Sequence, residues 1–131
     1  MILSEALSRQ IIAVTQKYVG RFFDWDTFNC VHFVREVYRE VGIELPRLVR
    51  GKLPPQDFHL SKERFESMPL GHSVFFRRRT SISDRSWTHV AIIAGRDQLV
   101  HCTRHLGNGV SISSTLEFLN VYELALDQRS F

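Results

Sequence analysis

Three residues in this sequence carry the side chains that a thiol-based hydrolase needs, namely Cys30, His89 and His101. Cys30 follows Asn29 at the start of an amphipathic stretch, where a helix is expected to begin. The N–H groups and the dipole at a helix start favour the thiolate over the thiol, so Cys30 is a candidate nucleophile. The alternative is a small core residue, which is the role of most free cysteines.

His89 and His101 lie in two apolar segments, WTHVAIIAG and QLVHCTR. If the hairpin between them turns through residues 95–97, Ala94 pairs with Gln98 and the two imidazoles become diagonal neighbours on one sheet face. A two-residue turn would instead place them on opposite faces. As neighbours, one imidazole could take the thiol proton while the other fixes its tautomer. Two core histidines bonded to backbone groups are the alternative.

Two helices are expected in the first third of the chain. Apolar residues recur every three to four positions over residues 3–18, with Ser4 before them and Gly20 after them. The second helix is expected from Cys30 to Val41, with Asn29 or Thr27 as its N-cap and Gly42 at its C-terminal end. His32 then points away from Cys30, which indicates packing or capping.

The second half of the chain is expected to form an antiparallel sheet. It contains five β-rich runs, interrupted by Gly-Arg-Asp, Gly-Asn-Gly and Thr-Leu-Glu-Phe: residues 73–78, 87–95, 98–104, 109–114 and 119–126. Residues 43–72 are expected to be a long loop with one short helix near Leu60 to Ser67, and His72 is expected to be solvated. Helices followed by strands predict one α+β domain over residues 1–131.

Composition narrows the classes of function. The 131 residues carry a formal net charge of only +3 and no basic stripe interleaved with aromatic residues, which argues against a nucleic-acid partner. No segment approaches the roughly 20 apolar residues of a membrane span, and the first residues do not form a signal peptide. We therefore expect synthesis in the cytoplasm, a monomer and reduced cysteines. His89, His101 and Cys30 lack the closely spaced ligand pair of a zinc site, so no metal is expected.

The order of these motifs resembles that of the NlpC/p60 superfamily of papain-like cysteine peptidases. Four segments are similar: Gly20 to Trp25, Phe28 to Tyr38, Gly71 to Phe76, and Thr88 through His101 to Ser113. The resemblance implies that Cys30 is the nucleophile, His89 the general base and His101 the orienting third member. It also implies N-terminal helices packed on a barrel-like antiparallel sheet of five to six strands, and a peptide of peptidoglycan as substrate. No cofactor is implied.

The segment around the nucleophile departs from the usual pattern of this superfamily. Phe23 stands where a tyrosine is usual, and Asn29-Cys30-Val31-His32 stands in place of Asp-Cys-Ser-Gly. Phe23 and Asn29 are therefore candidate substrate contacts, and Trp25 and Trp87 could line the cleft or simply pack in the core. Asn-Cys-Val-His-Phe-Val is similar to the signature of the lecithin–retinol acyltransferase branch, in which the catalytic histidine precedes the cysteine.

The resemblance, together with Cys30, His89 and His101, implies a cysteine hydrolase acting on an amide bond of cell-wall peptide or a muropeptide. Two alternatives stay open: a thioester-forming acyltransferase or lipid hydrolase, and a non-catalytic phage-tail or binding scaffold. Because a chain made in the cytoplasm does not meet the cell wall, a wall substrate would also require a delivery machine, a phage particle or lysis.

Overall fold

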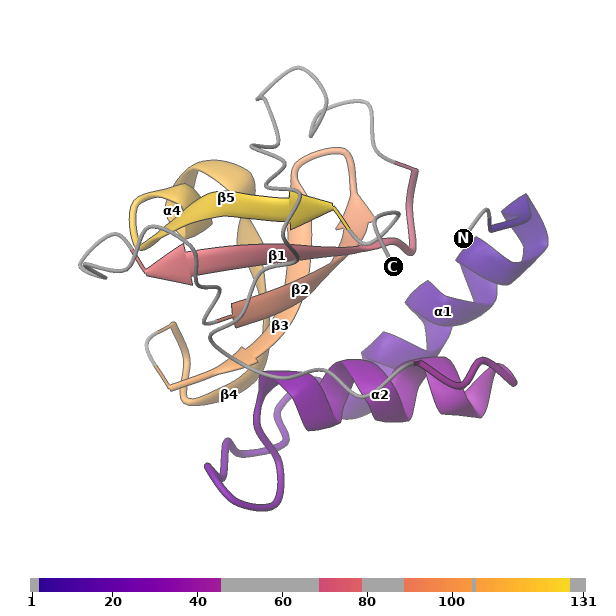
Figure 1. The fold of residues 1–131 in the computed structure, drawn as a ribbon, viewed down its shortest axis with the longest axis horizontal. Coiled ribbons are helices and arrows are strands. Elements are labelled where there is room, and N and C mark those ends of the chain that lie inside the picture. Colours follow the sequence, from indigo (N-terminus) through magenta and orange to yellow (C-terminus); the bar gives the residue numbers. More distant parts are fainter. Residues whose placement is uncertain (1–2, 46–68, 79–88, 105, 128–131) are drawn as a thin grey trace.

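The computed structural model describes residues 3–45, 69–78, 89–104 and 106–127 (Figure 1). It contains two N-terminal helices, an antiparallel sheet, and a short helix before the last strand. The elements are α1 (Glu5–Tyr18), α2 (Cys30–Glu40), β1 (Ser73–Arg78), β2 (His89–Gly95), β3 (Gln98–Thr103), β4 (Gly109–Ser114), α4 (Thr115–Leu119) and β5 (Tyr122–Asp127). The α+β class predicted from the sequence is confirmed.

Local capping signals fix the ends of both long helices. The hydroxyl of Ser4 accepts a hydrogen bond from the N–H of Leu7 at the start of α1, and Asn29 is the N-cap of α2. After α2 the chain turns at Gly42, whose φ of +84° is a conformation that a side chain disfavours. Both helices therefore begin and end within a residue or two of their predicted bounds.

The sheet has the strand order β4-β3-β2-β1-β5, and every described pair is antiparallel. β5 returns from α4 to the outer edge of β1, so the first and last strands lie side by side. Among the described strands, β4 and β5 are the two edges of an open sheet. The predicted helices packed on an antiparallel sheet are confirmed, whereas closure into a barrel is not observed in this part of the chain.

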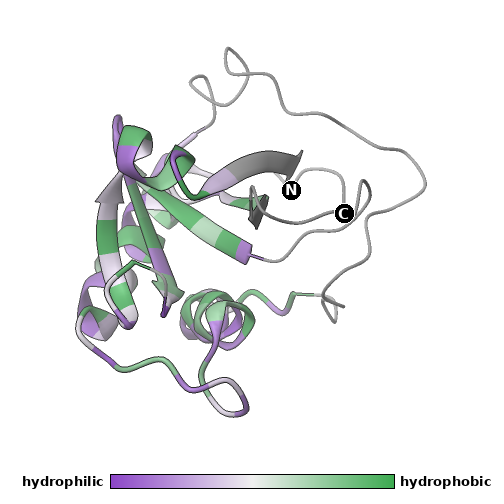
Figure 2. Cartoon of the chain, turned by 90° about the vertical axis from the view of Figure 1, so that its left-hand side faces the viewer, coloured by the Kyte–Doolittle hydropathy of each residue, from purple (hydrophilic) through white to green (hydrophobic). Residues whose placement is uncertain are grey.

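The sheet separates two layers of the core, with α1 and α2 together on one side and α4 on the other (Figure 1). Alternate residues of β2 and β3 pack with α2 in a helix-side cluster: Val90, Ile92, Val100 and Cys102. Their sequence neighbours pack with Phe118 of α4 and with Tyr122 in an α4-side cluster: Ala91, Ile93 and Leu99. Hydrophobic residues predominate in the central strands (Figure 2), as expected for strands that are buried on both faces.

The β2–β3 hairpin differs from the prediction in its turn. Gly95 pairs with Gln98, so the loop has two residues, and the register shifts between Ile93 and Gly95. The expected pairing of Ala94 with Gln98 is therefore wrong. The irregularity adds one residue to β2, however, and beyond it Ile92 pairs with Val100, the register expected from the longer turn. The bulge therefore cancels the change of face that a two-residue turn alone would cause.

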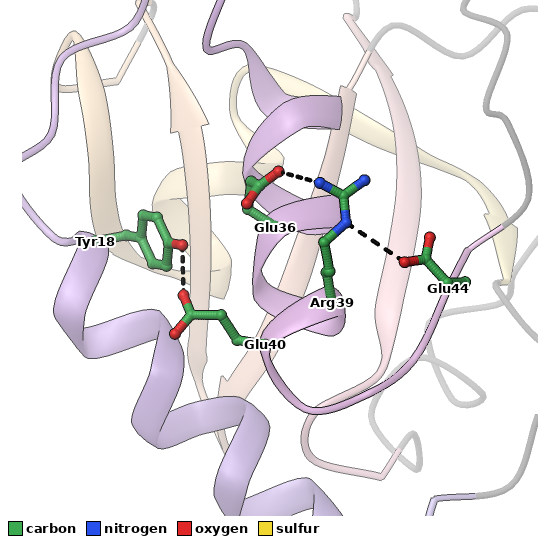
Figure 3. Close-up of polar contacts among 5 residues, drawn as sticks. All are labelled: Tyr18, Glu36, Arg39, Glu40 and Glu44. Atoms are coloured by element: carbon green, nitrogen blue, oxygen red, sulfur yellow. Dashed lines mark hydrogen bonds and ion pairs between the residues drawn. The ribbon is translucent and has the colours of Figure 1, made fainter.

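Polar contacts fix the packing of α1 on α2 (Figure 3). Glu40 near the end of α2 accepts a hydrogen bond from the Tyr18 hydroxyl and pairs with Lys17, both at 2.5 Å. Burial, followed by the bond to Glu40, raises the pKa of Tyr18 to about 12.

On the outer side of α2, Arg39 pairs with Glu36 at 2.8 Å and Glu44 at 3.5 Å.

The Thr-Leu-Glu-Phe stretch interrupts the strands, as predicted, and it does so by forming α4, whose N-cap Ser114 accepts a hydrogen bond from the N–H of Glu117. His72 was expected in solvent, yet it is buried, because it directly precedes β1 and its carbonyl accepts from Ile93.

Two other predictions fall on residues that the structure does not describe, and a third is compared with the described helices. The short helix predicted near Leu60 to Ser67 lies outside the described residues, as does Trp87. None of the described helices has the length and apolar character needed to cross a membrane.

Candidate functional site

A reciprocal pair of hydrogen bonds closes the start of α2 around Cys30. The side-chain oxygen of Asn29 accepts from the N–H groups of Val31 at 2.9 Å and His32 at 3.2 Å. In return, Nδ1 of His32 accepts from the N–H of Asn29 at 3.1 Å. This capping box, with histidine in the place of the usual Glu or Gln, holds Cys30 in the first turn of the helix. The capping role expected for Asn29 and for His32 is confirmed.

The segment that leads into α2 is bonded to the edge of the sheet. Gly20 donates to the carbonyl of Val110, the N–H of Val110 donates to Arg21, and Phe23 donates to the carbonyl of Asn108. Gly109 allows this close approach, since a Cβ at that position would overlap the carbonyl oxygen of Arg21. The backbone before Cys30 is therefore placed by β4.

Cys30 is fully buried and belongs to the helix-side cluster, which also contains Cys102. The Cys102 thiol lies 3.6 Å from the carbonyl oxygen of Phe28. Burial, with a smaller contribution from Cys30, raises the pKa of Cys102 to about 12. Cys102 is therefore a core thiol, and it stays protonated at neutral pH.

The structure brings the two predicted histidines together. The rings of His89 and His101 are edge to face, with centroids 5.3 Å apart, and both residues are buried. Tyr122 stacks on His89 at 4.6 Å, and Phe118 contacts the rings of His89 and His101 at 5.6 and 4.9 Å. The Tyr122 hydroxyl is itself fixed, since it shares a hydrogen bond of 2.9 Å with Thr103. The imidazole pair thus lies in an aromatic pocket on the α4 side.

Within the described residues, His101 has one polar partner in this pocket. Its Nε2 lies 2.8 Å from the hydroxyl oxygen of Ser113 on β4, and both residues are buried. Burial lowers the pKa of His101 to about 4, because the charged imidazolium loses its hydration. His101 is therefore neutral at pH 7 and has one donor and one acceptor nitrogen.

The predicted substrate contacts surround the start of α2. Phe23 is half-buried and Trp25 is 57% exposed, with ring centroids 6.3 Å apart, and the guanidinium of Arg104 lies 6.0 Å from the Trp25 ring. Asn29 is buried, and its amide group also donates to the carbonyl of Trp25 at 3.0 Å. The substrate contacts predicted for these residues stay predictions.

The three predicted catalytic residues are distributed over both layers. His89 and His101 are in contact, whereas Cys30 packs with the alternate residues of the same two strands. Because His89 is the first residue of β2, it lies at the end of the sheet layer that separates the two clusters. The described residues contain no group of three or more histidine, cysteine or acidic side chains that could hold a metal ion.

Sequence reasoning missed Ser113, Phe118 and Tyr122, which line the histidine pair. Tyr122 and Phe118 lie close to His89 only because α4 returns the chain to the sheet. Ser113 could have been found from the β3–β4 register: His101 faces Ser111, so Ser113 is its diagonal neighbour.

Comparisons with known proteins agree with the fold. The NlpC/P60 family model matches residues 17–122. A solved structure from Staphylococcus aureus, described as similar to lipoprotein, NLP/P60 family, is 19% identical with a TM-score of 0.64 and covers 95% of this chain. An NlpC/P60 family protein from Bacillus cereus is 24% identical with a TM-score of 0.66 and covers 90%.

The two solved structures are longer than this chain, which covers 42% and 39% of them. At these identities the likeness shows the fold. A search of curated proteins finds no significant match.

Proposed function

Because this chain belongs to the NlpC/P60 family, we propose that it is a cysteine hydrolase that cleaves an amide bond in cell-wall peptide. The family match supports a cell-wall peptidase or amidase as the class of enzyme. In this proposal Cys30 is the nucleophile, His89 is the general base and His101 orients His89. The substrate is a peptide of peptidoglycan or a muropeptide, and no metal takes part.

The reaction follows from these three roles. His89 takes the proton of the Cys30 thiol, and the thiolate attacks the carbonyl carbon of the scissile amide. The backbone N–H of Cys30, at the start of α2, would stabilise the oxyanion that forms. His89 then returns the proton to the leaving amine, which breaks the C–N bond and leaves a thioester on Cys30. Water activated by His89 hydrolyses the thioester and regenerates the thiol.

The observation that supports this proposal best is the buried contact between His89 and His101. A neutral imidazole held beside a second imidazole can fix the tautomer of its neighbour without competing for its proton. The pKa of His101, lowered to about 4, suits that role, because His101 does not take the proton that the base must carry.

The Asn-Cys-x-His segment also fits the hydrolase proposal. Asn29 and His32 are bonded to each other's backbone and cap α2. A structural role is therefore sufficient to explain both residues, and the departure from Asp-Cys-Ser-Gly does not by itself require a lipid substrate.

The test is a muropeptide mass profile of purified Gram-negative and Gram-positive peptidoglycan. It would be incubated with wild type, Cys30→Ala and, as a matched control, Cys102→Ala, which removes the other buried thiol of the same cluster. The proposal predicts new peptide-truncated fragments with wild type and Cys102→Ala only, and their masses would identify the bond. Unchanged profiles with all three proteins would contradict it.

Acyl transfer is the second candidate, and a surface feature favours it. Phe22 and Trp25, in the segment that leads to Cys30, are 77% and 57% exposed, and such side chains could contact an acyl chain. Incubation with a phospholipid or acyl thioester would then add the mass of the acyl group to wild type and leave Cys30→Ala unchanged. A mass shift together with an unchanged muropeptide profile would favour this candidate. If there is no mass shift and no new muropeptide fragment, a non-catalytic scaffold would be favoured.

Access to the substrate is part of the proposal. For a wall substrate we propose delivery to the periplasm or cell wall by a secretion machine, a phage particle or lysis, whereas a recycled muropeptide would be met in the cytoplasm. Immunogold labelling of producing cells would distinguish these routes, since label confined to the cytoplasm would favour the muropeptide.

A further inference from the structure

The hydrogen bond between His101 and Ser113 is a buried polar contact of the histidine pocket to which the proposed triad assigns no role. Ser113 is 3% exposed and His101 is fully buried, so bulk water does not compete for this bond of 2.8 Å. β4 is hydrogen-bonded to β3 along its whole length, from Gly109 opposite Thr103 to Ser114 opposite Gln98. The hydroxyl is therefore presented from a fixed backbone.

The other ring nitrogen of His101 is in a different situation. Its Nδ1 is buried and has no hydrogen-bond partner within the described part of the chain. A neutral imidazole carries its proton on one nitrogen, so the group bonded to Nε2 decides whether Nδ1 is a donor or an acceptor. The titratable side chains that face this ring across the pocket are His89 on β2 and, stacked on His89, Tyr122 on β5.

To orient His89, His101 must have Nδ1 as an acceptor and not as a donor. A general base that takes the thiol proton on one nitrogen carries a proton on the other, and that N–H needs an acceptor. His101 can accept only if its Nδ1 is unprotonated, and its own proton is then on Nε2, directed at the Ser113 oxygen.

We propose that Ser113 is a positioning residue: its hydroxyl oxygen accepts from Nε2–H of His101 and so keeps Nδ1 of His101 as the acceptor for the catalytic base. Ser113 acts through His101 and does not contact the substrate. This inference rests on the proposed function for its consequence in catalysis, whereas the tautomer itself is a property of the folded protein. The site would therefore be a chain of four side chains: Cys30, His89, His101 and Ser113.

The first test reads the tautomer directly. Long-range 1H–15N spectra of protein labelled with 15N-histidine give the protonated nitrogen of each imidazole, and His101→Gln identifies the His101 signals by their loss. We expect the Nε2–H form of His101 in wild type and Ser113→Thr, which keeps a hydroxyl, and exchange-averaged nitrogen shifts in Ser113→Ala. The Nδ1–H form in wild type would overturn the proposal, as would an unchanged tautomer in Ser113→Ala.

The second test measures turnover. Ser113→Ala should lower kcat about tenfold with KM nearly unchanged, and Ser113→Thr should recover most of the loss, as expected for a group that acts on the base. Ser111→Ala is the matched control: it removes a hydroxyl from the same strand, but one that donates to the carbonyl of Leu106. Equal losses in Ser113→Ala and Ser111→Ala, or no recovery in Ser113→Thr, would overturn the proposal.

The two tests also separate this inference from the proposed function. If wild type shows no Cys30-dependent hydrolysis, the proposed function fails, and the spectra of wild type still decide whether Ser113 sets the tautomer. If wild type hydrolyses peptide but carries the Nδ1–H form of His101, the hydrolase stands and the role of Ser113 is lost.

Discussion

On the helix side of the sheet, the residues of β2 and β3 that pack against α2 are apolar apart from the Cys102 thiol, whereas on the α4 side the same strands bury two imidazoles. The thiol of Cys30 depends on α2, whose start is fixed by the capping box of Asn29 and His32. The imidazoles depend on strand register and on an aromatic pocket. The proposed nucleophile and its proposed base are thus held by independent means, so that each can be changed while the other stays intact.

The largest effect expected from this comparison is on turnover. Cys30→Ala should lower hydrolysis of peptidoglycan peptide at least about 1,000-fold, because the nucleophile is lost, while the thermal unfolding midpoint changes little. Cys102→Ala should leave a turnover close to that of wild type, because it removes the other buried thiol of the same cluster and leaves Cys30 in place. Comparable activity in Cys30→Ala and wild type would contradict the mechanism.

A pH-dependent stability is expected from the α4 side. The pKa of His101 is about 4 in the folded protein and near 6.5 when unfolded, so the unfolded chain binds a proton more readily between these values. The free energy of unfolding therefore has its full value above pH 6.5, where His101 is neutral in both states. It decreases by about 3 kcal/mol as the pH falls toward 4, because the unfolded chain takes up the proton first. Urea unfolding of wild type and His101→Gln at several pH values would measure it. Parallel curves for the two proteins would show that His101 is not the group responsible.

The contact between the segment before α2 and β4 predicts a smaller loss. Gly109→Ala should reduce the free energy of unfolding by about 2 kcal/mol, because the new Cβ overlaps the Arg21 carbonyl oxygen. Gly42→Ala is the control: Gly42 also has a positive φ, but a Cβ there meets no atom within 4 Å. Equal losses in the two variants would attribute the effect to backbone conformation alone.

The smallest effect concerns the capping box. Asn29→Ala should destabilise the protein by about 1 kcal/mol, since the N–H groups of Val31 and His32 lose their acceptor. Asn29→Asp keeps the acceptor oxygens and should recover most of this loss in chemical denaturation. If Asn29→Ala unfolds at the same urea concentration as wild type, the cap does not hold the helix start.

The features that were predictable from the sequence are those with local signals. The caps Ser4 and Asn29 and the glycine at 42 mark the ends of α1 and α2, because they act within one turn of the helix. The contact between His89 and His101 was predicted correctly although the turn on which the prediction rested was wrong. The bulge between Ile93 and Gly95 compensates for the shorter turn and restores the expected register. No local pattern in an apolar strand marks such a bulge.

The features that were missed depend on distant parts of the chain. α4 has only five residues, too few for a hydrophobic period to be recognised. Phe118 and Tyr122 contact the histidines because α4 and β5 bring them back to the sheet, and Ser113 contacts His101 because of the β3–β4 register. Such contacts depend on the order and register of the strands, which no local sequence pattern predicts.

The central claim is that Cys30 on the helix side and His89 on the α4 side form one site. The most direct test is the pH dependence of Cys30 alkylation by iodoacetamide, followed by peptide mass spectrometry in wild type and His89→Ala. In wild type, Cys30 should react well below the free-thiol pKa of about 8.5, and the midpoint should rise in His89→Ala. Cys102, whose pKa is raised to about 12, should react slowly in both proteins and serves as an internal control. An ordinary thiol profile for Cys30 in both proteins would show that the two sides do not form one site.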